Sequence, residues 1–283
     1  MVEEMSSEIG SARGVALIGC GAIGSLVAKA IDEGLVNARL LYLLDIVVEK
    51  AEELAKVLRQ RPRVAREIGE ILEDEDVEVV VEAASQEAVL QYAERVLEAG
   101  KELVVLSVGA LLRPELKHLL EDYGERIHIP SGAIAGLDAL RSLALVGIKR
   151  VVLTTRKHPS KLLDSPYARR RRLDLERVKE PVVVFEGPAE VAVREFPRSL
   201  NVAATLALYS GAPVHVRVVA DPVATRNVHE VEVESEASRI TITVENVPHP
   251  LNPKTSYLAA LSAISLLREL CASPRGGSRL PSV

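Results

Sequence analysis

Three glycines follow a short apolar run near the start of the chain, at the spacing of a dinucleotide-binding turn. Residues 15–18 are apolar, and Gly19, Gly21 and Gly24 then fill the fixed positions of a G-x-G-x-x-G pattern. In such a turn the first glycine permits the sharp bend, the second leaves room for a pyrophosphate, and the third lets the next helix pack closely on the strand. Backbone amides at the start of that helix bind phosphate oxygens. The pattern indicates a dinucleotide site, although glycine-rich turns after strands also occur without one.

An acidic residue at the end of the next apolar run supports this interpretation. Residues 40–44 are followed by Asp45, about 20 residues after Gly24, which is the spacing of the acid that binds the adenosine ribose. A carboxylate there accepts hydrogen bonds from the ribose diol and repels a 2′-phosphate, so Asp45 predicts NAD in preference to NADP. The alternative is that Asp45 caps a helix beginning near Val48.

One histidine stands out as a candidate proton acceptor. A nicotinamide cofactor takes up a hydride, so the protein must accept a proton, and histidine titrates in the required range. Of the six histidines, His229 begins an alternating strand in phase with Val231 and Val233, on a face that is otherwise apolar. The loop of residues 220–227 before it can border a cleft. A histidine on an apolar face is more often a hydrogen-bonded core residue, so both roles stay open.

The first half of the chain has the pattern of an α/β domain with a doubly wound parallel sheet, the Rossmann type. Continuous apolar runs such as residues 78–84 and 103–107 alternate with amphipathic helical segments. Ligands bind such sheets outside the carboxyl ends of the strands. Small or polar residues follow the strands there, and we expect them to line a cofactor crevice: Ala84, Ser85, Gln86, Ser107, Val108, Gly109, Ser131, Gly132 and Ala133.

The second half has the pattern of an α+β domain on a mixed or antiparallel sheet. Residues 214–220, 229–234 and 239–245 alternate apolar and polar side chains, as strands with one covered face do. Residues 255–270 form a helical pattern with Thr255 as a possible cap. We therefore expect a flexible tail over residues 1–13, a dinucleotide-binding domain over 14–132, a substrate, catalytic and dimerisation domain over 133–254, a helix packing back on the first domain over 255–272, and a flexible tail over 273–283.

Composition excludes several classes of protein. The net charge of −5 and the 3% aromatic content argue against a nucleic-acid partner. No apolar run approaches the roughly 20 residues that span a bilayer, and residues 1–13 lack the core of a signal peptide, so we expect a cytoplasmic protein with no membrane partner. The two cysteines, Cys20 and Cys271, suit neither a disulfide framework nor a metal site. The basic run at residues 169–172 is expected to be a solvated loop rather than an anion site.

Beyond the glycine turn, the sequence resembles the L-aspartate dehydrogenases of archaea and bacteria, which are related to an NAD-biosynthesis branch. The likeness extends from Val15 to about Leu270. It rests on the segments at residues 18–24, 81–86, 106–110, 131–138, 153–157, 196–204, 227–229 and 252–257. The first segment is generic, whereas the later ones in this order are specific to the family.

The resemblance implies oxidative deamination of L-aspartate to oxaloacetate and ammonia through iminoaspartate, feeding NAD biosynthesis, with NAD or NADP reduced; Asp45 makes NAD the preferred cofactor and NADP a possible one. It matches His229 to the catalytic histidine, which acts either on the amine or on the water that attacks the imine. Ala133 and Asn201 match cofactor contacts; Asn201 would bind the nicotinamide carboxamide or else cap the helix that follows. In the glycine turn, the expected cofactor contacts are Gly19, Cys20, Gly21, Ala22, Ile23 and Gly24.

Aspartate carries two carboxylates, which require cationic or amide groups. The candidates in the matching segments are Ser131, Gly132, Arg156, Lys157, Lys254, Thr255 and Ser256, and each cation has a surface ion pair as its alternative role. The alternating strands of the second half favour a homodimer through that sheet. Competing functions are a related oxidoreductase, such as homoserine dehydrogenase or dihydrodipicolinate reductase, and an NAD-sensing module without catalysis.

Overall fold

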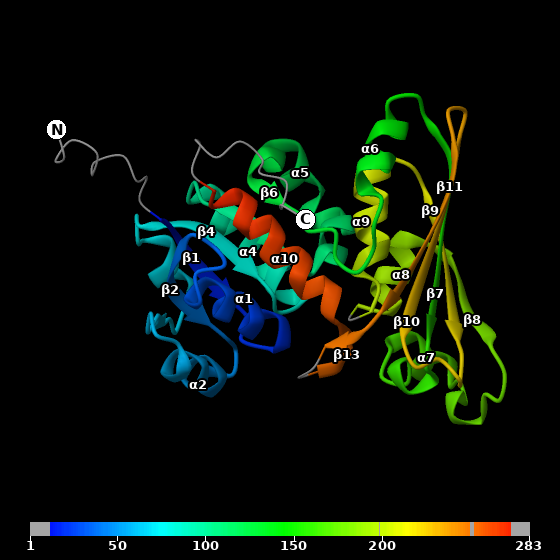
Figure 1. Ribbon diagram of the computed structural model, residues 1–283, viewed down its shortest axis with the longest axis horizontal. Helices are drawn as coiled ribbons and strands as arrows, with labels where there is room; N and C mark the ends of the chain where they lie inside the picture. Colours follow the sequence, from blue (N-terminus) through cyan, green and yellow to red (C-terminus); the bar gives the residue numbers. More distant parts are fainter. Residues whose placement is uncertain (1–11, 198, 250–251, 273–283) are drawn as a thin grey trace.

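The chain folds into two lobes side by side, each built on its own β-sheet (Figure 1). The computed structural model describes residues 12–197, 199–249 and 252–272, with the backbone alone for residues 252–255. The tails expected at residues 1–11 and 273–283 lie outside the described residues. Arg13, which we expected in the first tail, instead begins the first strand and forms ion pairs with Glu78 and Glu102.

The first lobe is a six-stranded parallel sheet in the order β3-β2-β1-β4-β5-β6, as the sequence predicts for a doubly wound domain. Its strands are β1 (Arg13–Ile18), β2 (Ala38–Leu44), β3 (Arg63–Val64), β4 (Val77–Glu82), β5 (Glu102–Val105) and β6 (Ile127–His128). The apolar runs in β1 and β4 are buried because helices cover both faces of the sheet.

Helices of the first lobe follow the alternation of the sequence. They are α1 (Ala22–Asp32), α2 (Val48–Val57), α3 (Ile68–Leu72), α4 (Gln86–Glu98) and α5 (Lys117–Tyr123). The last helix of the chain, α10 (Tyr257–Leu270), returns to this lobe and lies beside α1 (Figure 1). Its buried side chains, Ala263 and Leu267, join the apolar cluster that contains Val27 and Ile31. The end of the chain thereby ties the second lobe back to the first.

The C-terminal helix begins later than the sequence predicts. Two short antiparallel strands precede it, β12 (Pro248–His249) and β13 (Asn252–Ser256). Pairing with β12 keeps the backbone of residue 255 extended, so α10 starts at Tyr257 with Ser256 at its N-cap. The expectation that Thr255 caps this helix is wrong.

The second lobe is a five-stranded mixed sheet in the order β11-β10-β7-β9-β8. Its strands are β7 (Ile148–Lys157), β8 (Val182–Pro188), β9 (Val214–Ala220), β10 (Asn227–Ser235) and β11 (Arg239–Asn246). Only β7 and β9 pair in parallel. The helices α6 (Leu137–Ala144), α8 (Ala189–Glu195) and α9 (Asn201–Ser210) lie on the side of this sheet that faces the first lobe (Figure 1). The predicted mixed sheet with one covered face is confirmed.

The arginine run is helical rather than a solvated loop. Three of its arginines form the second half of α7 (Pro166–Arg171), whose first turn is capped by the Ser165 hydroxyl. Tyr167 holds this helix to the lobe because its ring packs against Phe185 at a centroid distance of 5.3 Å. Arg170 forms an ion pair of 2.6 Å with Glu195. Proline at the first helical position and serine before it are helix-start signals that the charge of the run obscures.

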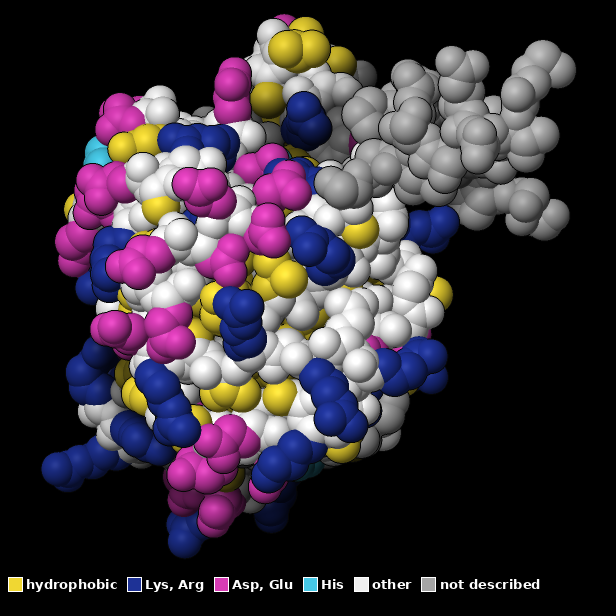
Figure 2. Space-filling model, turned by 90° about the vertical axis from the view of Figure 1, so that its left-hand side faces the viewer, with side chains coloured by type: hydrophobic (Ala, Val, Ile, Leu, Met, Phe, Trp, Pro, Cys, Tyr) yellow, Lys and Arg dark blue, Asp and Glu magenta, His cyan; other side chains and the backbone are white. Residues whose placement is uncertain are grey.

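The surface of the first lobe has charges of both signs. On the face shown in Figure 2, acidic and basic side chains are interspersed and apolar side chains are scattered among them. None of the helices in the described part of the chain is long and apolar enough to cross a bilayer.

Candidate active site

The glycine turn has the space and the open helix end that a pyrophosphate needs. Gly19 has φ +98°, and a Cβ there would lie 2.7 Å from the Ala83 backbone, so no other residue fits. A Cβ on Gly21 would instead point into open space. Gly21 is the N-cap of α1, and no side chain caps this helix. The turn therefore leaves room beside uncapped amides, in front of Ala22 and Ile23, as a phosphate site requires.

Asp45 lies at the end of β2 and holds the glycine turn. One of its carboxylate oxygens accepts a hydrogen bond of 2.7 Å from the Cys20 amide, and the other accepts one of 2.9 Å from the Val47 amide. The helix α2 has Val47 as its N-cap and no side-chain cap. The alternative role of Asp45 as a helix cap is thus excluded. Burial raises the pKa of the Cys20 thiol to about 12, so Cys20 contributes only its backbone at neutral pH.

A buried glutamate that sequence reasoning missed fixes the next two strand ends. The Glu82 carboxylate accepts hydrogen bonds from the amide of Ala84 at 2.8 Å and from the amide and hydroxyl of Ser107 at 2.9 and 2.8 Å. Burial raises the pKa of Glu82 despite these hydrogen bonds. The Ser107 hydroxyl is therefore committed to Glu82. The sequence indicates this residue only by the unusual position of a glutamate at the end of an otherwise apolar strand.

Three polar groups join the strand ends of the first lobe to the second lobe. The Gln86 amide donates to the carbonyls of Val193 and Pro197, each at 3.3 Å. The amide of Gly109, in a short 3-10 helix, donates to Asn201 Oδ1 at 3.2 Å. Asn201 begins α9, but its side chain does not cap it. The capping alternative for Asn201 is wrong, and its amide instead lies at the junction of the lobes.

His229 lies on the covered face of the second sheet with an unsatisfied ring nitrogen. It stands opposite Thr155 in the pairing of β10 with β7, and the two residues are 2% and 0% exposed. His229 Nδ1 and Thr155 Oγ1 have no hydrogen-bond partner among the described residues. Burial, with a smaller effect of the positive charge of Lys157, lowers the pKa of His229 to about 3. The imidazole is therefore uncharged at neutral pH, and its Nδ1 is available to a ligand, as donor or acceptor according to the tautomer.

Lys157 lies next to this histidine and is itself buried. It is 5% exposed, and its ammonium donates to the Ser199 carbonyl at 2.8 Å, two residues before Asn201. Burial, together with the nearby Lys161, lowers the pKa of Lys157 to about 7. The Lys161 ammonium reaches the Asn227 side-chain oxygen at 3.1 Å. Sequence reasoning missed Lys161 and Asn227 as site residues, and only the matching segment that contains Asn227 offered a signal.

The linker between the lobes passes beside the same strands. The Gly132 amide donates to the Ser262 hydroxyl of α10 at 3.0 Å, and the Ala133 carbonyl accepts from Asn246 Nδ2 at 3.1 Å. Asn246 pairs with Asn227 across β11 and β10. Of the substrate residues predicted in this region, Ser131 is half-buried and Ser256 is buried. The side chains of Lys254 and Thr255 lie outside the described residues. No group of three potential metal-ligating side chains occurs among the residues that the structure describes.

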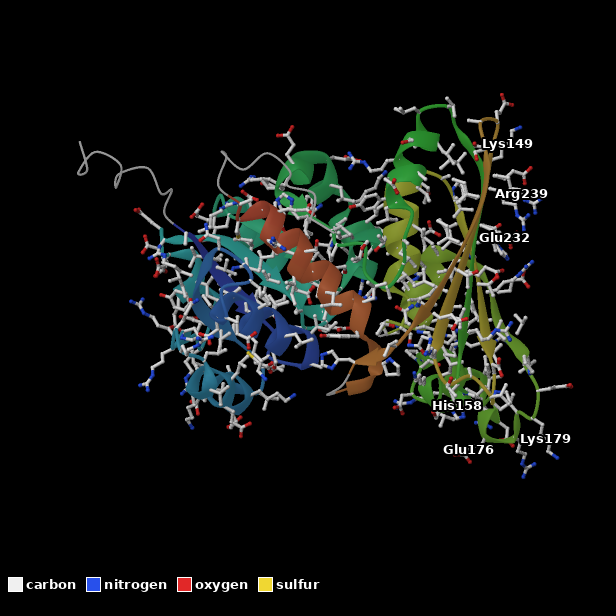
Figure 3. All side chains as sticks on the ribbon, in the orientation of Figure 1. Lys149, His158, Glu176, Lys179, Glu232 and Arg239 are labelled. Carbon is white, nitrogen blue, oxygen red and sulfur yellow. The ribbon has the colours of Figure 1, made fainter. Side chains whose placement is uncertain are left out.

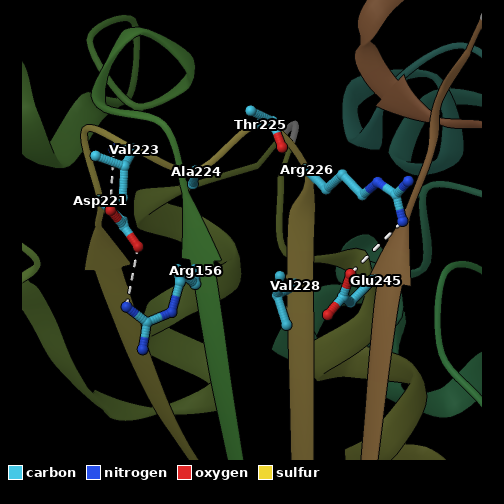
Figure 4. A pocket seen from close by; sticks show the side chains of 8 residues that line it. All are labelled: Arg156, Asp221, Val223, Ala224, Thr225, Arg226, Val228 and Glu245. Carbon is cyan, nitrogen blue, oxygen red and sulfur yellow. Dashed lines mark hydrogen bonds and ion pairs between the residues drawn. The ribbon is translucent and has the colours of Figure 1, made fainter.

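Arg156 is the predicted substrate residue that the structure separates from His229. Neighbouring residues of a strand point to opposite faces, so Arg156 lies on the outer face and forms a 3.0 Å ion pair with Asp221. This pair borders a hollow of about 440 Å³ on the outer face (Figure 4). The hollow is lined by Arg156, Asp221, Val223, Ala224, Thr225, Arg226, Val228 and Glu245. Arg226 and Glu245 also form an ion pair there, at 3.6 Å.

A dinucleotide turn on a parallel sheet, joined to a second lobe with a buried histidine on a mixed sheet, defines a two-domain oxidoreductase that uses a pyridine nucleotide. Each of the two lobes matches a known protein family that supports this class. Residues 19–130 match the NAD-binding domain of homoserine dehydrogenase, and residues 138–270 match the C-terminal domain of aspartate dehydrogenase. The chain belongs to the aspartate dehydrogenase family.

Individual relatives cover nearly the whole chain. The L-aspartate dehydrogenase of Methanosarcina barkeri is 43% identical over 270 residues, which are 93% of this chain and 99% of that protein. The enzyme of the same name from Methanocaldococcus jannaschii is 39% identical, over 93% of this chain and 99% of its own. The crystal structure of aspartate dehydrogenase from Thermotoga maritima superposes with a TM-score of 0.72 at 30% identity, covering 94% and 99% of the two chains.

Proposed function

We propose that this chain is an L-aspartate dehydrogenase that oxidises L-aspartate with NAD. L-Aspartate, water and NAD would give oxaloacetate, ammonium, NADH and a proton, through iminoaspartate. The relatives that span the chain support the substrate. The observation that carries the proposal is the buried His229, with its free Nδ1 beside the Lys157 ammonium, on the sheet face that looks toward the first lobe. A buried acceptor next to a cation suits an amine substrate that also carries carboxylates.

The first lobe supplies the cofactor site in this proposal. The glycine turn would hold the pyrophosphate, and Asp45, fixed by the amides of Cys20 and Val47, would accept hydrogen bonds from the adenosine ribose. Asn201 would bind the nicotinamide carboxamide across the junction of the lobes. NAD bound there would supply the acceptor for the hydride that leaves the substrate Cα. Because an anchored carboxylate repels a 2′-phosphate, we favour NAD over NADP.

His229 would act as the proton acceptor. Its imidazole is uncharged at neutral pH because burial and Lys157 lower its pKa to about 3. Nδ1 can then accept a proton from the substrate amine or from the water that attacks the imine. Carboxylates bound beside Lys157 would offset the positive charge near the ring, so that the pKa of His229 rises when the substrate is present. The substrate itself would thus make His229 a stronger base.

A grid of cofactors and substrates tests this function. NADH or NADPH formation is followed by absorbance with L-aspartate, L-homoserine and L-alanine, each with NAD and with NADP; reduction of dihydrodipicolinate is followed in the opposite direction. We expect the highest kcat/KM for L-aspartate with NAD. Higher turnover of homoserine or dihydrodipicolinate would reassign the substrate. Tight NADH binding with no turnover of any substrate would instead indicate a sensing module.

We further infer a cytoplasmic homodimer whose product feeds NAD biosynthesis. Cys20 and Cys271 are both buried free thiols, which suits a reducing compartment. The outer face of the second sheet carries charged side chains such as Glu232 and Arg239, which point away from the lobe (Figure 3). We place the dimer contact on this sheet because its alternating strands can pair across a two-fold axis. Light scattering after gel filtration tests it: a monomeric mass would contradict the assembly but not the activity.

A further inference from the structure

Four polar side chains form a patch on the covered face of the second sheet. Thr155 and Lys157 are two residues apart on β7, and Asn227 and His229 are two residues apart on β10. Side chains two residues apart point to the same face of a strand, and His229 stands opposite Thr155. All four are buried. Lys161, from the 3-10 turn that follows β7, adds a second ammonium at Asn227, 3.1 Å from its side-chain oxygen.

The two ammonium groups of this patch have no anionic partner among the residues that the structure describes. Lys157 donates to the Ser199 carbonyl at 2.8 Å, and Lys161 donates to the Asn227 amide oxygen. Burial lowers the pKa of both lysines, and Lys161 lowers that of Lys157 further. Removing a cation from water without a counter-charge is costly, and placing a second cation beside it adds to the cost. Such an arrangement is understandable if a ligand brings the missing negative charges.

The three charged or titratable groups are arranged in sequence. Lys157 is two residues from Thr155, which stands opposite His229, and Lys161 contacts Asn227, two residues before His229. Lys157 is thus on the strand that pairs with that of His229, whereas Lys161 reaches the patch from the turn that follows, beside Asn227. A substrate whose amine faces His229 would direct its nearer carboxylate to Lys157 and a second carboxylate to Lys161.

We propose that Lys157 binds the α-carboxylate of the substrate and that Lys161, positioned by Asn227, binds the side-chain carboxylate and makes the site selective for dicarboxylic amino acids. This assignment rests on the proposed function. In this assignment Lys161 and Asn227 determine substrate specificity, because the positive charge of Lys161 favours a substrate with a second carboxylate. An uncharged side chain of the same length would leave the Lys161 ammonium without a counter-ion.

The test compares L-aspartate with L-2-aminobutyrate, which has a methyl group in place of the second carboxylate. Lys161→Met should raise KM for L-aspartate by roughly 10- to 100-fold, the size of one charge-assisted hydrogen bond, with little change in kcat. KM for L-2-aminobutyrate should stay within about twofold, because this substrate does not use Lys161. Lys161→Arg should recover part of the loss. An unchanged KM for L-aspartate, or an equal loss for both substrates, would overturn the assignment.

A second variant acts through Lys161 without removing it. Asn227→Asp would place a carboxylate 3.1 Å from the Lys161 ammonium, in the position of the present amide oxygen. This internal anion should compete with the second carboxylate of the substrate, so KM for L-aspartate should rise by a larger factor than KM for L-2-aminobutyrate. Lys149→Met is the matched control, because Lys149 lies at the opposite end of β7 from His158, the residue that follows Lys157 (Figure 3). It is exposed and pairs with Glu236, so its loss should leave both KM values unchanged.

Succinate binding separates this inference from the proposed activity. Succinate has two carboxylates and no amine, and its binding to the NADH-loaded protein can be followed by NADH fluorescence, with butyrate as the monocarboxylate control. We expect the wild type to bind succinate more tightly than butyrate, and Lys161→Met to remove the difference. This result would support the lysine pair even if L-aspartate were not turned over. Equal binding of both acids by the wild type would overturn it even in an active aspartate dehydrogenase.

Discussion

His229 and Thr155 stand opposite each other on the paired strands β10 and β7, and each has a buried polar atom with no hydrogen-bond partner among the described residues. Leaving a buried polar atom unpaired costs about 1–3 kcal/mol, so two such atoms at one place are unusual in a folded core. Their position beside Lys157, on the face toward the nucleotide-binding lobe, gives them a common explanation. A substrate or a water molecule would satisfy both.

Replacing His229 with alanine should abolish most turnover without affecting cofactor binding. Loss of a general base lowers kcat by on the order of 10²–10⁴-fold. NADH affinity, measured by fluorescence, should be unchanged because the glycine turn lies in the other lobe. His215→Ala is the control: His215 lies on β9, is half exposed and pairs with Glu186 at 2.8 Å. Full activity of His229→Ala would remove this residue from the mechanism.

Asp45→Ser should relax the preference for NAD. The substitution removes the negative charge that opposes a 2′-phosphate, so the ratio of kcat/KM for NAD to that for NADP should fall by at least about tenfold, equivalent to 1.4 kcal/mol. Part of the fall in kcat/KM with NAD would arise because the Cys20 amide loses the acceptor of its 2.7 Å hydrogen bond. Kinetics with both cofactors at fixed L-aspartate measure the ratio. An unaltered ratio would place the ribose contact on another residue.

Gly109→Ala should weaken the junction between the lobes. A Cβ at this position would overlap the Gln86 side-chain amide and would lie 3.2 Å from Asn201 Oδ1. Gln86 can move only by giving up its hydrogen bonds to Val193 and Pro197. We expect a loss of about 1–3 kcal/mol in the free energy of unfolding and a lower Tm. Gly124→Ala is the matched control because nothing lies within 4 Å of its Cβ, and equal Tm values for the two variants would contradict the account.

Lys157→Met should change how stability depends on pH. The pKa of Lys157 falls from 10.5 to about 7 on folding, so between these values the unfolded chain binds more protons than the folded one. The penalty for burying the charged amine is complete below about pH 7 and disappears as the pH rises toward 10.5. The variant has no such penalty, so its free energy of unfolding relative to that of the wild type should be highest near neutral pH and should decline at higher pH. Urea unfolding across this range measures the difference, and a constant difference would mean that Lys157 titrates normally.

Much of the fold was predictable because its signals are local. The glycine turn, the continuous apolar runs of β1 and β4 and the alternation of β10 each occupy a few consecutive residues. The same alternation correctly placed His229 on the covered face. The helix at α7 was missed because its arginines suggested a loop, and the start of α10 was missed because β12 and β13 pair just before it.

The rest of the candidate site depends on contacts between distant parts of the chain. Lys161 and Asn227 are 66 residues apart, and Gly109 and Asn201 are 92 residues apart. No spacing rule in one sequence brings such pairs together, because the sheet order of the second lobe decides which strand ends meet. Arg156 and Lys157 show the same limit: both are cations in a matching segment, but only the strand register shows which one lies beside His229.

The most direct test of this account is the position of the ligands in a crystal structure of the protein with NADH and succinate. We predict that the nicotinamide C4 faces His229 with succinate between them, at contact distances of about 3–3.5 Å, and with one carboxylate at Lys157 and the other at Lys161. A nicotinamide ring bound far from His229, or succinate bound only in the outer hollow beside Arg156, would contradict it.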